Sequence, residues 1–345
     1  MIREKGTVEL KHGAGGPAMR ELVKSLLVER LPREAALAAT AVGPEDLDDG
    51  AAIPFGDRFL VITTDAHVVK PIFFPGGDIG RLAVSGVVND LAMMGATEVI
   101  GLTSSVIIEE GFPLVSLERI RQSMRETSLE ASAFVLTGDT KVMARGELDG
   151  IVLSTSGVGL AQRVVRDAGL RAGDAIVITG SVGDHGLAVL SARHQLGLEG
   201  DLRSDVAPLN GLVRVALGAG GEAVHALKDP TRGGVTGALV EMAQKAKLGI
   251  VLDESAIPLT AAARAAAQIL GIDPLGVANE GKALLSVEAD AIRPILAALR
   301  AHPLGAQAAV IGRVVSDHPG EVLLDTGFGH RRLFERDAEA IPRIC

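Results

Sequence analysis

The sequence has almost no aromatic residues and only one cysteine. Aromatic side chains make up 2% of its 345 residues, and neither tryptophan nor tyrosine occurs. Hydrophobic residues still reach 47%, so the core must be built from aliphatic side chains. With a single cysteine, no disulfide can form within the chain. At this length we expect two domains, each with its own core.

A surplus of basic residues is also missing, since the net charge is -9. Proteins that bind nucleic acid need a basic patch to neutralise phosphates, so we expect no nucleic-acid partner. No apolar run approaches the length of a membrane span, and residues 1–5 lack the apolar core of a signal peptide. We therefore expect a cytoplasmic protein without a membrane partner, in a compartment where a free thiol stays reduced.

The one cysteine, Cys345, is the last residue of the sequence. A structural cysteine normally lies inside an apolar element, whereas a chain end is usually mobile unless it is tied down. Pro342 has no N–H group and disfavours helical geometry at Ile341, which predicts an extended end. We interpret Cys345 as a nucleophile on an arm that visits more than one site. The alternative is a tail residue without a role.

Two glycine-rich turns carry candidate ligand-binding groups. Residues 12–17 precede apolar residues at helical spacing, which predicts a turn that opens a helix. Residues 229–234 follow a predicted strand and include Arg232. Such turns bring backbone N–H groups close to phosphate, which makes Gly15 and Gly16 candidates, although they also occur merely to reverse the chain. Neither an ordinary P-loop nor a kinase-type glycine loop is present.

Carboxylates stand at separate turns and helix positions along the chain. Polyphosphate chemistry needs oxygen ligands for a hard cation such as Mg²⁺, and N–H or cationic groups around phosphate. Asp90 interrupts an otherwise apolar helix, so it is either exposed or partnered, because an unpaired buried carboxylate is costly. A solvated acidic loop would explain Asp46 or Asp48 individually. The residues favour an ATP-using enzyme, with these carboxylates as candidates: Asp49, Asp65, Asp90, Asp139 and Asp229.

Two further motifs are expected at strand ends, where α/β proteins commonly place ligands. A short buried strand over 134–137 is predicted to run into residues 138–141, which supply a carboxylate, a hydroxyl and an ammonium group. Residues 278–282 supply a carboxylate and an ammonium group at another strand boundary. His185 stands at the start of a predicted helix, where it is either a catalytic base or a capping or packing residue.

Hydrophobic periodicity predicts strands mixed with helices in both halves of the chain. Besides the strand at 134–137, strands are expected at 59–62, 97–108, 151–158, 175–180, 223–227, 249–252, 282–287, 308–315 and 321–324. Helices are expected at 79–94, 117–131, 187–196, 235–246, 259–270 and 289–301.

Taken together and in order, these motifs resemble the HypE family of hydrogenase maturation proteins. The matching segments are residues 12–16, 48–51, 74–80, 89–92, 138–141, 229–234, 278–282 and 342–345. The resemblance covers essentially the whole chain, and the terminal cysteine makes the set specific. The wider superfamily includes aminoimidazole ribonucleotide synthetase, selenophosphate synthetase and thiamine phosphate kinase. Ala14 departs slightly from the family pattern, in which serine is common at this position.

The resemblance implies a two-domain, PurM-like α/β fold of α+β type with mixed sheets. Residues 1–160 would bind ATP and dimerise, residues 161–330 would form the second domain, and residues 331–345 would be a mobile tail. Two copies would pair into a homodimer through their N-terminal domains, with ATP near the interface. The implied cofactors are ATP and Mg²⁺.

The implied activity belongs to [NiFe]-hydrogenase maturation. A HypF-like carbamoyltransferase would place a carbamoyl group on Cys345, and ATP-dependent dehydration would turn it into a thiocyanate. The cyanide would then pass to iron on a HypC–HypD complex. The cysteine is needed because its thiolate attacks the carbamoyl donor. Oxide is a poor leaving group in the dehydration, and phosphorylation of the carboxamide oxygen lets that oxygen leave as phosphate.

The resemblance also assigns roles to residues. Lys141 and Glu280 would stabilise charge and remove protons, unless they form a structural salt bridge with each other. The acidic candidates carry over as ligands of Mg²⁺ or phosphate: Asp49, Asp65, Asp90, Asp139 and Asp229. The nucleotide or its phosphates would contact Gly15, Gly16, Thr63, Thr64, Asn89, Asp90, Gly138, Asp139, Thr140 and Arg232.

Two other functions remain open from the sequence. One is another ATP-using enzyme of the superfamily, of the selenophosphate synthetase or small-molecule kinase type. A selenophosphate enzyme is expected to carry its reactive cysteine near the N-terminus, where this chain has none. The other is a nucleotide-binding scaffold whose tail only docks a partner, in which case Cys345→Ala would leave function intact.

Overall fold

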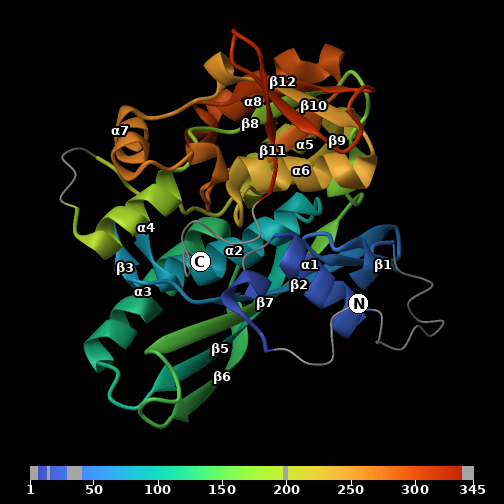
Figure 1. Ribbon diagram of the computed structural model, residues 1–345. Helices are drawn as coiled ribbons and strands as arrows, with labels where there is room; N and C mark the ends of the chain where they lie inside the picture. Colours follow the sequence, from blue (N-terminus) through green and yellow to red (C-terminus); the bar gives the residue numbers. More distant parts are fainter. Residues whose placement is uncertain (1–6, 14–15, 29–40, 197–200, 336–345) are drawn as a thin grey trace.

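Figure 1 shows the computed structural model of the chain. The structure describes residues 7–13, 16–28, 41–196 and 201–335. Two predicted site residues, Gly15 and Cys345, lie outside these described residues. In Figure 1 the first half of the chain, blue to green, lies below the second half, yellow to red. The long helix α2, Ile79–Met93, lies between them.

The first half is built on a five-stranded sheet with the order β1-β2-β7-β5-β6. Neighbouring strands are antiparallel except β5 and β6, which run parallel. The strands span Ala51–Phe55 (β1), Arg58–His67 (β2), Glu98–Glu109 (β5), Val135–Met143 (β6) and Ile151–Ala161 (β7). A short hairpin, Phe73–Phe74 (β3) with Gly77–Asp78 (β4), leads into α2.

One face of this sheet is covered by α2 and by α3, Leu114–Ala131. Asp78 begins α2 as its N-cap, because its carboxylate accepts hydrogen bonds from the amides of Gly80 and Arg81 at 2.8 and 3.0 Å. Every residue of α2 except Arg81 and Asp90 is buried. The predicted helix at 79–94 is therefore confirmed, and its apolar run reflects burial on almost all sides.

Among the described residues, no helix covers the opposite face of the sheet. Large apolar side chains are exposed there and along the edge strand β6, namely Ile53, Phe55, Ile62, Ile100, Leu136 and Val142. The prediction of a short buried strand at 134–137 is wrong in two respects. The strand β6 is an exposed edge strand, and it continues to Met143, so that residues 138–141 lie within it rather than at its end.

The second half is built on a seven-stranded mixed sheet with the order β14-β13-β10-β12-β8-β11-β9. Only the β10–β13 pair is parallel. The strands span Ala175–Ile178 (β8), Val224–Lys228 (β9), Gly249–Asp253 (β10), Leu284–Val287 (β11), Ala309–Val315 (β12), Val322–Asp325 (β13) and His330–Leu333 (β14). Residues 331–333 of the last strand fall in the segment 331–345, which the sequence analysis assigned to the tail.

Helices cover both faces of the second sheet, which gives three layers. Val177 and Leu227 pack with α5 and α8 on one face, whereas Ile176 and Ile178 pack with α6 on the other. The helices span Asp184–His194 (α4), Asn210–Gly220 (α5), Gly234–Ala246 (α6), Ala261–Leu270 (α7) and Ile292–Ala301 (α8). The sequence pattern missed α5, β1 and β14, but the predicted two-part α/β fold with mixed sheets is confirmed. No helix among the described residues is long and apolar enough to span a membrane.

Asn89 of α2 joins the two halves. Its side-chain amide donates to the carbonyl oxygens of Ala207 and Glu280, both at 3.2 Å, and its oxygen accepts from the amide of Leu209 at 2.7 Å. The side chain is 1% exposed. Both of its N–H groups and its oxygen thus serve contacts between α2 and loops of the second half, which fixes the neighbouring Asp90 against that half.

We expect Asn89→Ala to destabilise the protein by about 2–4 kcal/mol, because three buried backbone groups lose their hydrogen-bond partner. Urea unfolding followed by circular dichroism measures this change. Gln122→Ala, at an exposed hydrogen bond of α3, is the matched control and should change stability by less than about 0.5 kcal/mol. Equal stability of Asn89→Ala and the control would show that this bridge does not hold the halves together.

Candidate active site

Five carboxylates from distant parts of the sequence meet at the seam between the two halves. Three belong to the first half and two to the second. Asp49 precedes β1, Asp65 lies on β2, Asp90 lies on α2, Asp229 follows β9, and Glu280 precedes β11. Each of them is close enough to at least one of the others to shift its pKa. We call this group the carboxylate cluster.

Burial and mutual repulsion favour the protonated forms of most of these groups. Burial raises the pKa of Asp90 well above its ordinary value, and Asp229 and Asp65 raise it further. Burial, followed by the charge of Asp49, raises the pKa of Asp229 to about 7. Burial and the charges of Asp229 and Asp65 likewise raise the pKa of Glu280 well above its usual range. Burial and repulsion therefore disfavour the ionised forms of Asp90, Asp229 and Glu280.

Asp65 is the exception within the cluster. Burial would raise its pKa, but His67 and Arg232 more than offset this, and the pKa falls to about 2. Its carboxylate lies 3.2 Å from His67 Nε2 and 3.6 Å from Arg232 Nη2. Asp65 thus supplies a permanent negative charge beside a guanidinium group that faces the cluster.

Thr63 links two members of the cluster. Its hydroxyl lies 2.9 Å from both the Asp49 carbonyl oxygen and Asp90 Oδ2. Since strand residues alternate between faces, Thr63 and Asp65 point to the α2 side of β2, whereas Thr64 points to the uncovered face. The alternation explains why only one of the two predicted threonines reaches the cluster.

The buried Lys228 and the half-buried Lys245 compensate the charge of Asp49 and its neighbours. Lys228 Nζ lies 2.8 Å from Asp49 Oδ1 and 3.3 Å from Asp167 Oδ2. Lys245 Nζ lies 2.6 Å from Asp167 Oδ2 and 2.9 Å from Glu241 Oε1. The sequence analysis missed Lys228, although one signal was present: a lysine closes a strand that is otherwise apolar apart from His225 and immediately precedes Asp229.

The carboxylate cluster has the chemistry that Mg²⁺ requires. Asp49 Oδ2 and Glu280 Oε1 are buried and have no hydrogen-bond partner among the described residues. Carboxylate oxygens are preferred ligands of Mg²⁺, and a cation would relieve the repulsion between them. Among the described residues, no three acidic, histidine or cysteine side chains form a complete metal-binding group. This fits an ion bound through one or two carboxylates together with water and substrate phosphates.

A second group of predicted site residues lies away from the cluster, on the uncovered face of the first sheet. The register places Thr64, Ser156, Thr103 and Thr137 in one row across that face. Asp139 and Lys141 follow along β6 on the same face, and both are exposed. Gly138 and Thr140 lie on this strand as well, so that one copy of the chain does not bring residues 138–141 to the cluster.

Lys141 and Glu280 do not form the salt bridge that the sequence left open. Lys141 is exposed on β6, whereas Glu280 is buried beside Asp229 and Asp65. No ion pair between these two described residues occurs within one copy of the chain. The two residues could act together if Lys141 came from elsewhere, such as a second copy of the chain.

The remaining predicted residues are placed as follows. Gly16 is the N-cap of α1, Pro17–Leu22, and the Met19 sulfur of that helix lies 3.5 Å from Arg232 Nη1. His185 is fully buried, with its Nδ1 2.8 Å from the Ser204 hydroxyl and its ring edge-on to Phe74 at 5.4 Å. These contacts favour a packing role for His185 over the role of a catalytic base.

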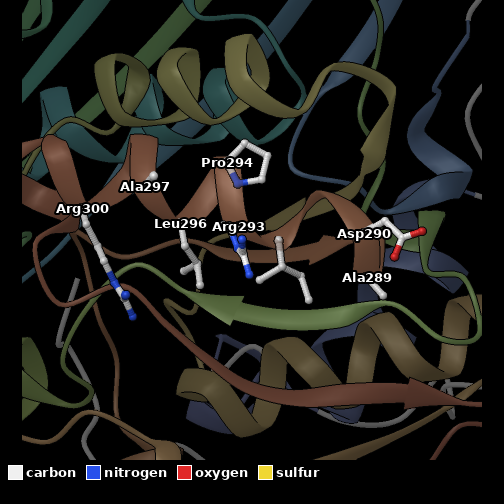
Figure 2. A pocket seen from close by; sticks show the side chains of 8 residues that line it. Ala289, Asp290, Arg293, Pro294, Leu296, Ala297 and Arg300 are labelled. Atoms are coloured by element: carbon white, nitrogen blue, oxygen red, sulfur yellow. The ribbon is translucent and has the colours of Figure 1, made fainter.

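A separate cavity lies in the second half of the chain, as Figure 2 shows. All of its lining residues come from the segment 289–300, at the start and along the length of α8. None of them is a predicted site residue, and none belongs to the carboxylate cluster. The cavity therefore does not alter the assignment of the site.

Comparison with known proteins agrees with the fold. The protein-family model described as AIR synthase related protein, N-terminal domain, matches residues 47–161. The family model of the corresponding C-terminal domain matches residues 171–325. The carboxylates Asp49, Asp65 and Asp90 fall within the first match, and Asp229 and Glu280 fall within the second. The chain is thus a two-domain AIR synthase related protein.

Relatives that match nearly the whole chain narrow this class. Carbamoyl dehydratase HypE of Rhizobium leguminosarum bv. viciae is 45% identical over 99% of this chain and 95% of its own length. A crystal structure of hydrogenase maturation protein HypE in complex with ATP superimposes with a TM-score of 0.80 at 39% identity, covering 98% of this chain and 100% of that one. A chain in a crystal structure of a HypE–HypF complex superimposes with a TM-score of 0.83 at 38% identity, covering 91% of this chain and 99% of that one. The chain belongs to the HypE family, as its motifs indicated.

The cluster predicts a specific dependence of stability on pH. The pKa of Asp229 is raised to about 7, so the folded state holds this proton more tightly than the unfolded state. The stability that this group contributes is present below about pH 4 and is lost as the pH rises through about 7. Asp229→Asn cannot ionise, so at pH 8, without nucleotide or Mg²⁺, we expect it to be more stable than the parent by about 1–3 kcal/mol.

Urea unfolding at pH 4 and pH 8 measures this difference. The variant and the parent should be alike at pH 4 and should diverge at pH 8. Asp317→Asn, at an exposed position of the second half, is the control and should change little at either pH. A variant that is less stable than the parent at pH 8 would contradict the assigned repulsion.

Proposed function

We propose that this protein uses ATP to dehydrate a carbamoyl group on the thiol of Cys345 and so supplies the cyanide ligand during [NiFe]-hydrogenase maturation. In this reaction the thiocarbamate R–S–C(O)NH₂ and ATP give the thiocyanate R–S–C≡N, ADP and phosphate. The carboxamide oxygen leaves as part of the phosphate, and both nitrogen protons are lost. The observation that carries the proposal is the buried carboxylate cluster with Glu280 as one of its members.

The phosphoryl transfer places the terminal phosphate of ATP beside the cluster. One or two of the carboxylates Asp49, Asp65, Asp90 and Asp229 would hold Mg²⁺ together with water and phosphate oxygens. A bound Mg²⁺ would neutralise phosphate charge and orient the transferred group. Arg232 would contact the phosphate oxygens, because its guanidinium already lies beside Asp65. The HypE structure in complex with ATP, which resembles this chain over 98% of its length, supports the assignment of the nucleotide.

Glu280 is the proposed base for the nitrogen protons. Its Oε1 is buried and has no hydrogen-bond partner among the described residues, and its pKa is raised by burial and by Asp229 and Asp65. A carboxylate in such surroundings accepts a proton readily once it has been ionised. Neutralisation of the neighbouring aspartates would favour that ionised form. The amide of Glu280 donates to Asp205 Oδ1 at 3.0 Å, which fixes the backbone at this position.

The partners follow from the chemistry of the two ends of the reaction. A HypF-like carbamoyltransferase would deliver the carbamoyl group, and a HypC–HypD complex would accept the cyanide. The structure described as a HypE–HypF complex, at 38% identity, supports the first of these partners. We assign the reaction to the cytoplasm.

The uncovered face of the first sheet supports a homodimer. It carries exposed apolar side chains near β1 and β2 and polar residues along β6. A second copy packed on this face would bury the apolar groups and could bring its own Gly138, Asp139, Thr140 and Lys141 toward the cluster of the first copy. Two copies would then complete each nucleotide site, with Lys141 stabilising phosphate charge opposite Glu280.

We expect Glu280→Gln to keep its fold and bind ATP but to form thiocyanate at least about 100-fold more slowly, because the amide cannot accept the nitrogen protons. Mass spectrometry of the C-terminal peptide follows the gain of one carbamoyl group and the loss of one water. Glu254→Gln, at an exposed position, is the matched control. Cys345→Ala should gain no carbamoyl group. Normal water loss in Glu280→Gln would remove Glu280 from the reaction.

We expect Leu136→Glu to weaken dimer formation at least about 100-fold, because a buried charge in an interface costs about 3 kcal/mol or more. Leu136 is 68% exposed on β6. Sedimentation velocity over a range of protein concentrations measures the effect. Ile269→Glu places the same charge at a residue of α7 that is 66% exposed and should leave association unchanged. Identical sedimentation of Leu136→Glu and the parent would place the interface elsewhere.

A further inference from the structure

An ion pair joins the beginning of the described chain to its end. Arg20 of α1 and Glu335 form two hydrogen bonds across 315 residues. Arg20 Nη1 lies 2.6 Å from Glu335 Oε1, and Arg20 Nη2 bonds to Glu335 Oε2. The pair is bidentate, which is the strong and directional form of an arginine–carboxylate contact.

Glu335 is an unusual carboxylate for a position so close to the end of the sequence. Its side chain is 7% exposed, whereas the preceding Phe334 is 68% exposed. It lies two residues beyond the end of β14. A buried carboxylate is costly unless it is paired, and Arg20 supplies the pairing. The hydrogen bonds from Arg20 therefore hold the backbone at residue 335 in a defined place.

That place is the rim of the carboxylate cluster. The neighbour of Arg20 in α1 is Met19, whose sulfur lies 3.5 Å from Arg232 Nη1. Arg232 in turn lies 3.6 Å from Asp65. On its other side, Arg20 is close enough to Glu241 to help lower the pKa of that carboxyl against the effect of burial. The ion pair is thus linked to the cluster through Arg232 and to the two lysines through Glu241.

We propose that the Arg20–Glu335 ion pair anchors the root of the C-terminal segment at the rim of the cluster, so that Arg20 and Glu335 are positioning residues for the reaction of Cys345. The proposal rests on the function proposed above. Cys345 lies ten residues after Glu335, and a stretch of this length can span at most about 33–36 Å. An anchored root keeps the thiol within reach of the cluster and raises its effective concentration there, whereas a released root lets the same segment explore a larger volume.

The chemical test uses the sole thiol of the chain. Cyanate converts the Cys345 thiol into the thiocarbamate by addition of HNCO across S–H, so no carbamoyltransferase is needed. Single-turnover formation of thiocyanate is then measured with the carbamoylated chain itself. In parallel, a synthetic peptide of residues 340–345 with an S-carbamoyl cysteine is added to chains that carry Cys345→Ala. The first reaction depends on the anchor, and the second does not.

We expect Glu335→Gln to slow the reaction of the attached thiocarbamate about three- to tenfold. The rate with the added peptide and the KM for Mg-ATP should stay within about twofold of the parent, which a merely structural defect would not allow. The double variant Arg20→Glu, Glu335→Arg restores the pair with reversed charges and should recover most of the rate. Arg58→Gln removes one partner of an exposed ion pair with Glu98 and is the matched control.

Hydrogen–deuterium exchange tests the anchor without any chemistry. In Glu335→Gln, exchange should rise in residues 17–22 and 330–335 and remain unchanged elsewhere. If the parent forms no thiocyanate with either substrate, the proposed function fails, and the exchange result still decides whether the pair anchors the segment. Unchanged exchange, an unchanged rate of the attached group, or an equal loss of both rates in Glu335→Gln would overturn the proposal.

Discussion

The concentration of buried negative charge at one seam is the constraint on which the rest of the structure depends. Asp49, Asp90, Asp229 and Glu280 repel one another where water cannot screen them, and their raised pKa values express this cost. Lys228, which pairs with Asp49, offsets part of the negative charge of the cluster, and protonation of the carboxylates offsets more of it. Under the proposed function, this site would exchange protons for a divalent cation and its nucleotide.

The architecture explains how such a cluster is held together. The first half supplies Asp49, Asp65 and Asp90, and the second supplies Asp229 and Glu280, so neither half contains the site alone. The helix α2 lies in the seam, and Asn89 ties it to the backbone of Glu280 directly. The hydrogen bond from Asn89 to the Glu280 carbonyl oxygen therefore positions both Glu280, the proposed base, and Asp90, which follows Asn89 in α2. The Arg20–Glu335 pair joins α1 to the residue that lies two positions beyond the end of β14.

Sequence reasoning located much of the cluster but not its surroundings. Asp90 could be predicted because a carboxylate in an apolar helix demands a partner, and glycine-rich turns at 12–17 and 229–234 marked the loops. The exposure of β6 could not be predicted, because periodicity shows that a strand is apolar but not whether it lies at a sheet edge. Arg20 and Glu335 are 315 residues apart, and no local pattern connects them. Thr64 lies on the other face of β2 from Thr63, because neighbouring strand residues point to opposite faces, and its predicted contact with the nucleotide stays a prediction.

We propose that protons occupy the carboxylate cluster until a divalent cation and its nucleotide replace them. Isothermal titration calorimetry of Mg-ATP binding at pH 7, repeated in buffers with different ionisation enthalpies, measures the protons exchanged on binding. We predict a net release of protons for the parent and a smaller release for Asp229→Asn, because that group has no proton to lose. Binding without proton release, or with the same release in both proteins, would contradict the account.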